Sequence, residues 1–354
     1  MGEGWTRATP PFCMEVAKMK REKRKRKTSV AAIFFLLIFI GVFCFSGYKV
    51  GSQLLTEHVE DSAFQELISE VRRNQQSGAA ASGTAGNQAA GNGAAGKDGA
   101  QSGGAQSGGA QGGGAWDLLE QGDGAQSGAK QGADVILPDL SNVPWLDLER
   151  EMLPEYAPLF ERNHDFFGWI RIEDTKVDYP VMYTPEDPEY YLHRAFDGSY
   201  SFSGVPFMDG NCKVGCGNYI IYGHHMKNGT MFKEIVSYAK EDFREEHPLI
   251  YFDTLYERGV YEVFAAFYTQ VYARSRTDVF RYYDYYDISE QEAFEEYVKF
   301  VKAASLFDSE IEVEYGDQLI TLSTCEYHAK DGRFVVVARR LTEEEWLERM
   351  AVEE

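Results

Sequence analysis

A stretch of low-complexity sequence divides this chain into two unequal parts. Residues 76–133 are mostly Gly, Ala, Gln and Ser, and they include a near-repeat at 99–109. Such a composition cannot bury enough apolar surface to offset the entropy lost on ordering, so we expect a flexible linker. As a random coil it spans about 40 Å, from about 5–6 Å times the square root of its length. Only the sequence on either side of it is expected to fold.

An uncharged apolar segment lies on the N-terminal side of the linker. Residues 28–48 carry no charged side chain and match the about 20 residues that a membrane-spanning helix needs. A basic run at 18–27 comes directly before them and favours a cytoplasmic N-terminus. The alternative, a cleaved signal peptide, is disfavoured because no small-residue cleavage pattern follows Phe45. We expect a cytoplasmic tail at 1–27, a single transmembrane anchor, and a juxtamembrane segment at 49–75.

The sequence after the linker, residues 134–354, is rich in Tyr, Phe and Val. It is long enough to build one sizeable core, and the anchor places it outside the cell. The whole chain has a net charge of −21 despite its basic N-terminal run, which disfavours nucleic acid as a partner. The basic run itself is expected to attract anionic membrane lipid.

Signals for short strands dominate this outer domain. They occur at 167–172, 176–182, 204–208, 218–222, 249–252, 259–267, 318–325 and 333–341. Helix signals are fewer: they cover 147–162 and 230–239, and two others begin at capping boxes, Ser289 with Glu292 and Thr342 with Glu345. The pattern predicts a mainly β fold, either a barrel or a sandwich, with a few flanking helices.

Cys325 is the first candidate for a catalytic residue. It ends an apolar strand signal with hydroxylic neighbours, and Arg333 opens the next strand signal. An Asp-Gly turn signal between them predicts a hairpin, which brings Cys325 and Arg333 to the same end of adjacent strands. A thiol beside an arginine suits a nucleophile with an anion stabiliser. A small buried structural cysteine is the alternative.

A histidine supplies the base that such a thiol needs. His224 follows Gly223 at the end of an apolar strand signal, and His225 comes next. Strand alternation places the two histidines on opposite faces, so at most one faces a shared site. Gly223 permits an unusual turn or a close approach of substrate, which favours His224. His328 is a third candidate, in a loop where we expect it to be solvated. Cysteine, histidine and arginine together predict acyl transfer through a thioester.

The other cysteines suggest a disulfide. The chain has five cysteines, of which Cys13 and Cys44 precede or lie within the anchor. A bond between Cys212 and Cys216, which leaves Cys325 free, is the simple interpretation for an oxidising exterior. A zinc site that combines this pair with the two adjacent histidines is the alternative. Adjacent histidines on opposite faces make poor joint ligands, so we expect no metal and no other cofactor.

The chemistry-bearing residues together resemble a class B sortase. The resemblance rests on Thr321-Leu322-Ser323-Thr324-Cys325 followed by Arg333, on Tyr-Gly-His-His-Met-Lys-Asn-Gly-Thr-Met-Phe at 222–232, and on matches at 177–182 and 190–192. It covers about residues 163–340 and leaves the linker outside. The resemblance implies a closed eight-stranded β-barrel that carries out cell-wall transpeptidation.

The resemblance also implies a role for each central residue. Cys325 attacks the carbonyl of a threonine inside a C-terminal sorting signal and forms a thioester. His224 protonates the leaving amine and then assists the incoming amine, while Arg333 orients the substrate and helps to stabilise the oxyanion. The expected partners are a sorting signal of the Asn-Pro-x-Thr-Asn or Pro-Pro-x-Thr-Gly kind and a cell-wall peptide amine. We favour wall anchoring of single proteins over pilus assembly.

Further residues are candidates for binding the sorting signal. Ser323, Glu326 and Leu192 match groove positions of the family, and Thr324 stands between Ser323 and the nucleophile. Tyr283 belongs to a tyrosine-rich stretch that either contacts the peptide or only covers the barrel.

Two other functions stay open at this point. A hydrolytic cysteine protease differs only in using water as the acyl acceptor, although the papain-type signature is absent from the sequence. A non-catalytic adhesin or receptor would suit the anchor and linker equally well, and it predicts that Cys325→Ala leaves function intact.

Overall fold

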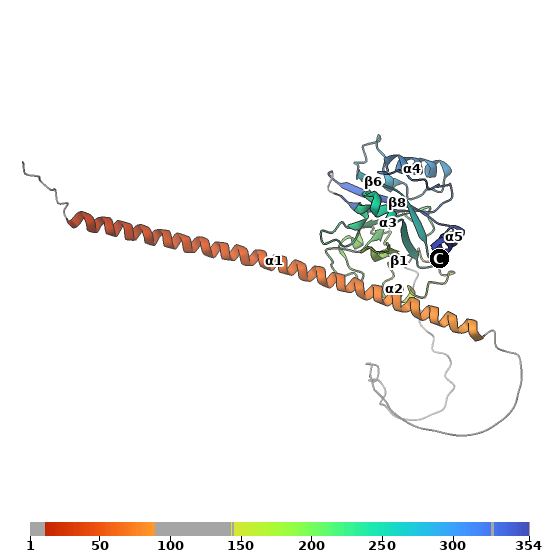
Figure 1. The fold of residues 1–354 in the computed structure, drawn as a ribbon, viewed down its shortest axis with the longest axis horizontal. Coiled ribbons are helices and arrows are strands. Elements are labelled where there is room, and N and C mark those ends of the chain that lie inside the picture. The colour runs from red at the N-terminus through yellow and green to blue at the C-terminus, as the bar shows by residue number, and fades with distance from the viewer. Residues whose placement is uncertain (1–10, 89–142, 144, 327–328, 354) are drawn as a thin grey trace, which may run out of the picture.

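One very long helix leads to a β domain and passes along one side of it (Figure 1). The computed structural model describes residues 11–88, 143, 145–326 and 329–353. The long helix is α1 (Pro11–Gln88). It contains 11–27 of the predicted tail, the whole predicted anchor and the juxtamembrane segment, whereas residues 1–10 lie outside the description.

Eight strands build the β domain. They are β1 (Phe166–Arg171), β2 (Asp178–Met182), β3 (Phe207–Met208), β4 (Asn218–Gly223), β5 (Leu249–Thr254), β6 (Val260–Gln270), β7 (Leu319–Cys325) and β8 (Gly332–Arg340). They pair in the order β1-β2-β3-β4-β7-β8-β6-β5, and β5 pairs back with β1, so the sheet closes on itself as a barrel. The predictions of a mainly β fold and of the eight strand positions are confirmed.

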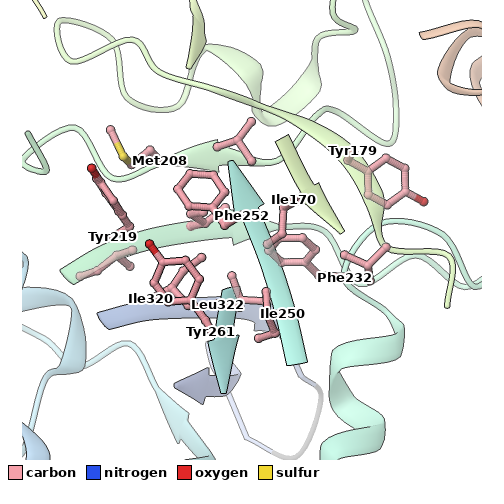
Figure 2. Close-up of a cluster of buried hydrophobic side chains, with 14 of the residues drawn as sticks. Ile170, Tyr179, Met208, Tyr219, Phe232, Ile250, Phe252, Tyr261, Ile320 and Leu322 are labelled. Carbon is pink, nitrogen blue, oxygen red and sulfur yellow. The ribbon is translucent and has the colours of Figure 1, made fainter. Parts of the chain in front are cut away.

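The barrel interior is filled by large apolar side chains from strands around its circumference. Figure 2 shows part of this cluster, with Ile170, Tyr219, Ile250, Phe252, Tyr261, Ile320 and Leu322 directed toward one another. Ile320 and Leu322 are two residues apart on β7 and therefore face the same side of the sheet. Thr321 and Ser323 face the other side, where their hydroxyls bond the hydroxyls of Tyr297 at 2.6 Å and Tyr282 at 2.7 Å.

The remaining helices are short and lie around the barrel. They are α2 (Ala157–Arg162), α3 (Glu241–Glu246), α4 (Gln291–Ala304) and α5 (Glu343–Glu353), with 3₁₀ turns η2 (Tyr190–His193), η3 (Glu234–Ala239) and η4 (Tyr282–Asp284). The helix predicted at 147–162 is wrong over most of its length, because only its last turn, α2, is helical. Pro154 disfavours helical geometry at the preceding residue, whereas Pro158 lies in the first turn of α2, where proline is tolerated.

Only one of the two predicted capping boxes forms. At α5 the Thr342 N–H donates to Glu345 Oε2 at 2.7 Å, and the Glu345 N–H donates to Thr342 Oγ1 at 3.2 Å. At α4 the Ser289 N–H instead donates to the Asp287 carboxylate at 3.2 Å, and the helix begins at Gln291. A local turn between Asp287 and Ser289 thus replaces the expected cap.

The helix α1 has one face in contact with the barrel. Within Ile33–Ser77 it contains a stretch that is long and apolar enough to cross a membrane, and the side chains of that stretch are not buried. Farther along, Phe64, Leu67, Ile68 and Val71 are buried in the same core as the barrel residues. We therefore find the domain packed against α1 before the linker begins.

The helix also takes in the start of the predicted linker, since α1 continues through 76–88. Alanine is abundant there and has the highest helix propensity. The rest of the predicted linker, 89–133, lies outside the described residues.

The expected disulfide between Cys212 and Cys216 is not formed in the structure. Both are free thiols. Each donates to the carbonyl oxygen of Asn218, which lies 3.5 Å from Cys212 Sγ and 3.2 Å from Cys216 Sγ. A shared acceptor satisfies the two thiols without a covalent bond. Cys325 is also a free thiol, as expected.

Candidate active site

The pairing of β7 with β8 sets the relative position of Cys325 and Arg333. The two residues are register partners at one end of this antiparallel pair, as the predicted hairpin requires. Next to them, the Glu326 N–H donates to the Gly332 carbonyl at 3.0 Å. Residues 327–328 of the connecting loop, including the candidate His328, lie outside the described residues.

The parallel pairing of β4 with β7 brings His224 to the same end. Gly223 is the register partner of Thr324, and the Thr324 hydroxyl donates to the Gly223 carbonyl at 2.8 Å. Because parallel strands run in the same direction, the residues that follow these two, His224 and Cys325, leave the pair side by side.

A cavity of about 940 Å³ opens at this end of the barrel. It is lined by most of the predicted site residues: Leu192, His224, Tyr283, Ser323, Thr324, Cys325 and Arg333. Glu326 lies outside that set and instead approaches His225, with 3.4 Å between Glu326 Oε2 and His225 Nδ1.

His224 is held from the side of η2. Its Nε2 lies 2.8 Å from the carbonyl oxygen of Leu192, and its ring stacks on that of His193, with centroids 5.3 Å apart and planes inclined by 22°. Burial lowers the pKa of His224 below its usual value of 6.5, and the charges of His193 and Arg333 lower it further. The Leu192 carbonyl opposes this trend. The ring is therefore neutral at pH 7.

His225 points to a different place, as strand alternation predicts. Its Nδ1 lies 2.8 Å from the backbone carbonyl oxygen of Cys325. His225 thus contacts the backbone of the thiol-bearing residue and is not among the residues that line the cavity. Of the two adjacent histidines, His224 is the one directed to the shared site.

Gly223 is required here by packing. A Cβ atom at this position would lie 2.5 Å from the ring of Phe232, so no larger residue fits without displacing that ring. Of the two uses considered for Gly223, the unusual turn does not occur, because the residue has a strand conformation and no positive φ, while a close approach of substrate stays a prediction. Phe232 is fully buried and its N–H donates to the His224 carbonyl at 2.9 Å.

The guanidinium of Arg333 is held beside the β7–β8 loop. Its Nη1 donates to the carbonyl oxygens of Gly332 at 3.0 Å and Asp331 at 3.4 Å. The side chain is half-buried and lines the cavity. A fixed cation close to Cys325 suits the stabilisation of negative charge on a reacting carbonyl.

The tyrosine-rich stretch divides between the barrel wall and the cavity. Tyr282 is buried, and burial raises its pKa to about 12 while its hydroxyl bonds Ser323. Tyr283 lines the cavity, and its hydroxyl accepts the Tyr272 N–H at 3.0 Å. One ring therefore completes the barrel wall and the next faces the groove.

Sequence reasoning missed several residues of the cavity wall. Asp209 accepts a hydrogen bond from the Tyr222 hydroxyl at 2.8 Å, and Arg281 donates to the Ala273 carbonyl at 3.0 Å. Both line the cavity, whereas His193 stacks behind His224. Arg281 stands inside the tyrosine-rich stretch and His193 directly follows a matched run, which are the only local signals.

The four side chains of the zinc alternative do not share a centre. The thiols of Cys212 and Cys216 turn to the Asn218 carbonyl, while His224 and His225 contact two other carbonyls. Across the part of the chain that the structure describes, no group of three or more His, Cys, Asp or Glu side chains could hold a metal ion.

Comparison with known proteins shows the family of the chain. Residues 170–341 match the family model described as Sortase domain. Sortase B of Listeria monocytogenes is 34% identical over 198 residues, and sortase B of Staphylococcus aureus is 31% identical over 198 residues. Each match covers 54% of this chain and 76% of the relative. A solved Staphylococcus aureus sortase B–substrate complex matches 58% of this chain and 90% of that chain, with 29% identity and a TM-score of 0.48. The chain belongs to the sortase family, as a class B sortase.

Proposed function

We propose that this protein is a membrane-anchored cysteine transpeptidase that cuts a C-terminal sorting signal after threonine and transfers the surface protein to a cell-wall amine. One geometric observation carries the proposal. The ends of β4, β7 and β8 bring His224, Cys325 and Arg333 around one cavity. A thiol, an imidazole and a guanidinium are the groups that acyl transfer through a thioester requires.

In the first half-reaction the Cys325 sulfur attacks the threonine carbonyl carbon. The neutral ring of His224 takes the thiol proton, which its lowered pKa permits at pH 7. The carbonyl electrons move to oxygen, where the positive charge of Arg333 stabilises them. When the C–N bond breaks, His224 returns the proton to the leaving amine and a thioester remains on Cys325.

In the second half-reaction an amine resolves the thioester. The amine nitrogen attacks the acyl carbon, His224 takes its proton, and Cys325 leaves as a thiolate and regains a proton. Water would complete the same step as hydrolysis. The family is one of cysteine transpeptidases in general, which favours an amine acceptor over water and an enzyme over a non-catalytic adhesin.

The cavity suits a short peptide in size and lining. Its volume of about 940 Å³ lies in the range of ligand-binding clefts. The hydroxyls of Ser323 and Thr324 already bond Tyr282 and the Gly223 carbonyl, so these two residues contribute mainly shape. Leu192 and Tyr283 offer apolar contact for a sorting signal of the Asn-Pro-x-Thr-Asn or Pro-Pro-x-Thr-Gly kind.

The apolar part of α1 supports a single-pass anchor. The basic run at 18–27 favours a cytoplasmic N-terminus and contact with anionic lipid, and it leaves the barrel outside the cell. There the enzyme would meet both the sorting signal of an exported protein and the amines of wall peptides.

The test is intact-mass measurement of the full chain in detergent micelles, mixed with peptides that carry the two sorting motifs. Triglycine or a diaminopimelate-type amine is added to half of the samples. We expect an acyl adduct on Cys325 that the amine converts to an amine-linked product. Cys325→Ala provides the control and should form no adduct.

Three other results would change the conclusion. An adduct that yields only free acid, even with amine present, would identify a hydrolytic protease. An adduct on another residue would contradict the assigned nucleophile. A folded protein that forms no adduct, and whose Cys325 resists alkylation, would favour the adhesin or receptor.

A further inference from the structure

We propose that Glu60 of α1 is a positioning residue for His224, so that the docked helix is part of the catalytic architecture. The connection runs from Glu60 through the loop 199–204 to η2, and from η2 to the His224 ring. The role of His224 in this inference rests on the proposed function, whereas the contacts themselves do not.

The docking of α1 is a specific packing contact. Phe64, Leu67, Ile68 and Val71 recur at the spacing of one helix face, and all four are buried. The ring of Phe64 packs edge-on against Tyr179 of β2, with centroids 5.2 Å apart and an interplanar angle of 83°. In Figure 1 the helix passes the barrel beside α2, and it also contacts β2.

Polar contacts fix the rotation and depth of the docked helix. Arg72 pairs with Asp178 of β2 at 3.2 Å, and Glu70 pairs with Arg162 of α2 at 2.5 Å. These pairs lie on either side of the apolar face, so α1 has one preferred register against the barrel.

Glu60 continues this contact face one turn before Phe64. Its Oε1 accepts the backbone N–H of Phe202 at 2.8 Å, and its Oε2 accepts the Ser203 hydroxyl at 2.6 Å. Both carboxylate oxygens are therefore used on one loop. Within this loop Ser201 and Ser203 are buried, whereas the aromatic side chains of Tyr200 and Phe202 are 75% and 51% exposed and add little apolar packing.

The same loop holds η2. The Ser201 N–H donates to the His193 carbonyl at 3.1 Å, and the Val205 N–H donates to the Tyr191 carbonyl at 3.2 Å. Gly204 has a φ of +60° and lies against η2 so closely that a Cβ would be 2.4 Å from the Leu192 carbonyl oxygen. The loop and Val205 directly after it thus contact the carbonyls of three successive residues of η2.

His224 depends on two of these three residues. Its Nε2 bonds the Leu192 carbonyl at 2.8 Å, and its ring stacks on His193. Because a carbonyl oxygen only accepts, Nε2 carries a hydrogen and Nδ1 is the basic nitrogen of the neutral ring. A shift of η2 would move the His224 ring and would weaken the hydrogen bond that sets its tautomer. Glu60 therefore acts on the base through the loop and without touching it.

The test compares Glu60→Ala with Glu66→Gln in the full chain in detergent micelles. Glu66 is an exposed carboxylate on the same helix and serves as the matched control. For the peptide that the wild type acylates best, we expect kcat of Glu60→Ala to fall about tenfold while KM changes little, since misplacement of a catalytic group costs rate more than binding. Glu60→Gln keeps an acceptor oxygen and should lose less.

The pH profile supplies a readout that a merely structural role would not move. The groups that face His224 are His193 from η2 and Arg333 from β8, with Cys325 of β7 on the same cavity. The hydrogen bond to the Leu192 carbonyl raises the pKa of His224. Weakening this bond should therefore move the part of the kcat/KM profile that reports His224 ionisation to lower pH. Hydrogen exchange of residues 190–204 should also accelerate in Glu60→Ala and stay unchanged in Glu66→Gln.

The outcomes separate this inference from the proposed function. If the wild type is active and Glu60→Ala matches Glu66→Gln in kcat, pH profile and exchange, the inference is wrong. A lower melting temperature with an unshifted pH profile would show a structural contact only and would also overturn it. If the wild type acylates no peptide, the proposed function fails, and the exchange at 190–204 alone decides whether Glu60 holds the loop.

Discussion

The two sides of the cavity are held in different ways. Cys325 and Arg333 are placed by backbone pairing at the end of β7 and β8, two strands whose preceding and following residues are fully buried in the barrel. His224 leaves β4 at its end, and a side-chain contact with η2 sets its ring. The comparison teaches that the side with Cys325 and Arg333 is as rigid as the barrel strands that hold it, whereas the histidine side depends on a chain of contacts that a few substitutions can alter.

The largest effect should come from breaking the rigid side. We expect Arg333→Ala to reduce kcat/KM for acylation by about 10²–10³-fold, as loss of an oxyanion donor does elsewhere. Arg333→Lys should recover only part of the loss, because an ammonium group lacks the planar fork of the guanidinium. Single-turnover acylation of Cys325, followed by mass, measures both variants.

Arg340 on the same strand offers a control for that change. It lies at the other end of β8, where it bonds Gln318 and does not line the cavity. Arg340→Lys should acylate at the wild-type rate. Equal losses at both positions would mean that strand β8 has been disturbed and that Arg333 has no special role.

A substitution at Gly223 tests the junction between the two sides. Gly223→Ala should destabilise the fold by about 1–3 kcal/mol, because its Cβ overlaps the Phe232 ring and the core is overpacked. Acylation should slow as well, since His224 is the next residue. Combining it with Phe232→Leu should restore part of the stability lost in urea unfolding.

The matched control is Gly51→Ala on α1, where the added Cβ meets no atom within 4 Å. This change should be neutral or slightly stabilising, since alanine favours helix more than glycine does. If the two alanine variants unfold alike, the close contact at Gly223 does not limit that position.

The pH dependence of stability tests whether the His224 ring is buried on the histidine side. Burial lowers the pKa of His224 in the folded protein, so the unfolded chain binds its proton more tightly. This contribution to stability is present above the ordinary pKa of 6.5 and is lost as the pH falls below it. His224→Gln should therefore lose less stability than the wild type on acidification, measured by urea unfolding at about pH 7.5 and about pH 5.5. Parallel losses in the two proteins would contradict the burial of the ring.

The smallest effect should appear far from the cavity. Thr342→Ala removes the capping box of α5 and should cost about 1 kcal/mol of stability. Because α5 lies at the other end of β8 from Arg333, acylation kinetics should not change. A reduced acylation rate would show that the barrel transmits disturbance along β8, against the rigid behaviour assigned to it.

The sequence predicted the rigid side best. Strand positions follow from alternation and β-branched runs, and the Asp-Gly signal implied the hairpin that pairs Cys325 with Arg333. These are local patterns. The Thr342 cap also formed, since its partner is only three residues away. At Ser289 the backbone N–H bonds Asp287, which is nearer in sequence than the predicted acceptor Glu292. The sequence pattern does not say which of the two acceptors is used.

The histidine side could be predicted only in part. Alternation separated His224 from His225, but the partners of the two rings, Leu192 and the Cys325 carbonyl, are 32 and 100 residues away in sequence. Glu60 is farther still from the loop that it contacts, since Phe202 is 142 positions away in sequence. Such contacts depend on how the elements pack against one another. Neither composition nor periodicity predicts them.

The docking of α1 also has a consequence for the predicted linker, residues 76–133, the Gly-rich stretch between α1 and the barrel. Since α1 packs on the barrel before that stretch and α2 follows it, both of its flanks belong to one packed body. A protease that cuts the linker would then leave the barrel held by its contacts with the helix. Lengthening the linker would also cost little free energy, because closure entropy grows only slowly with loop length.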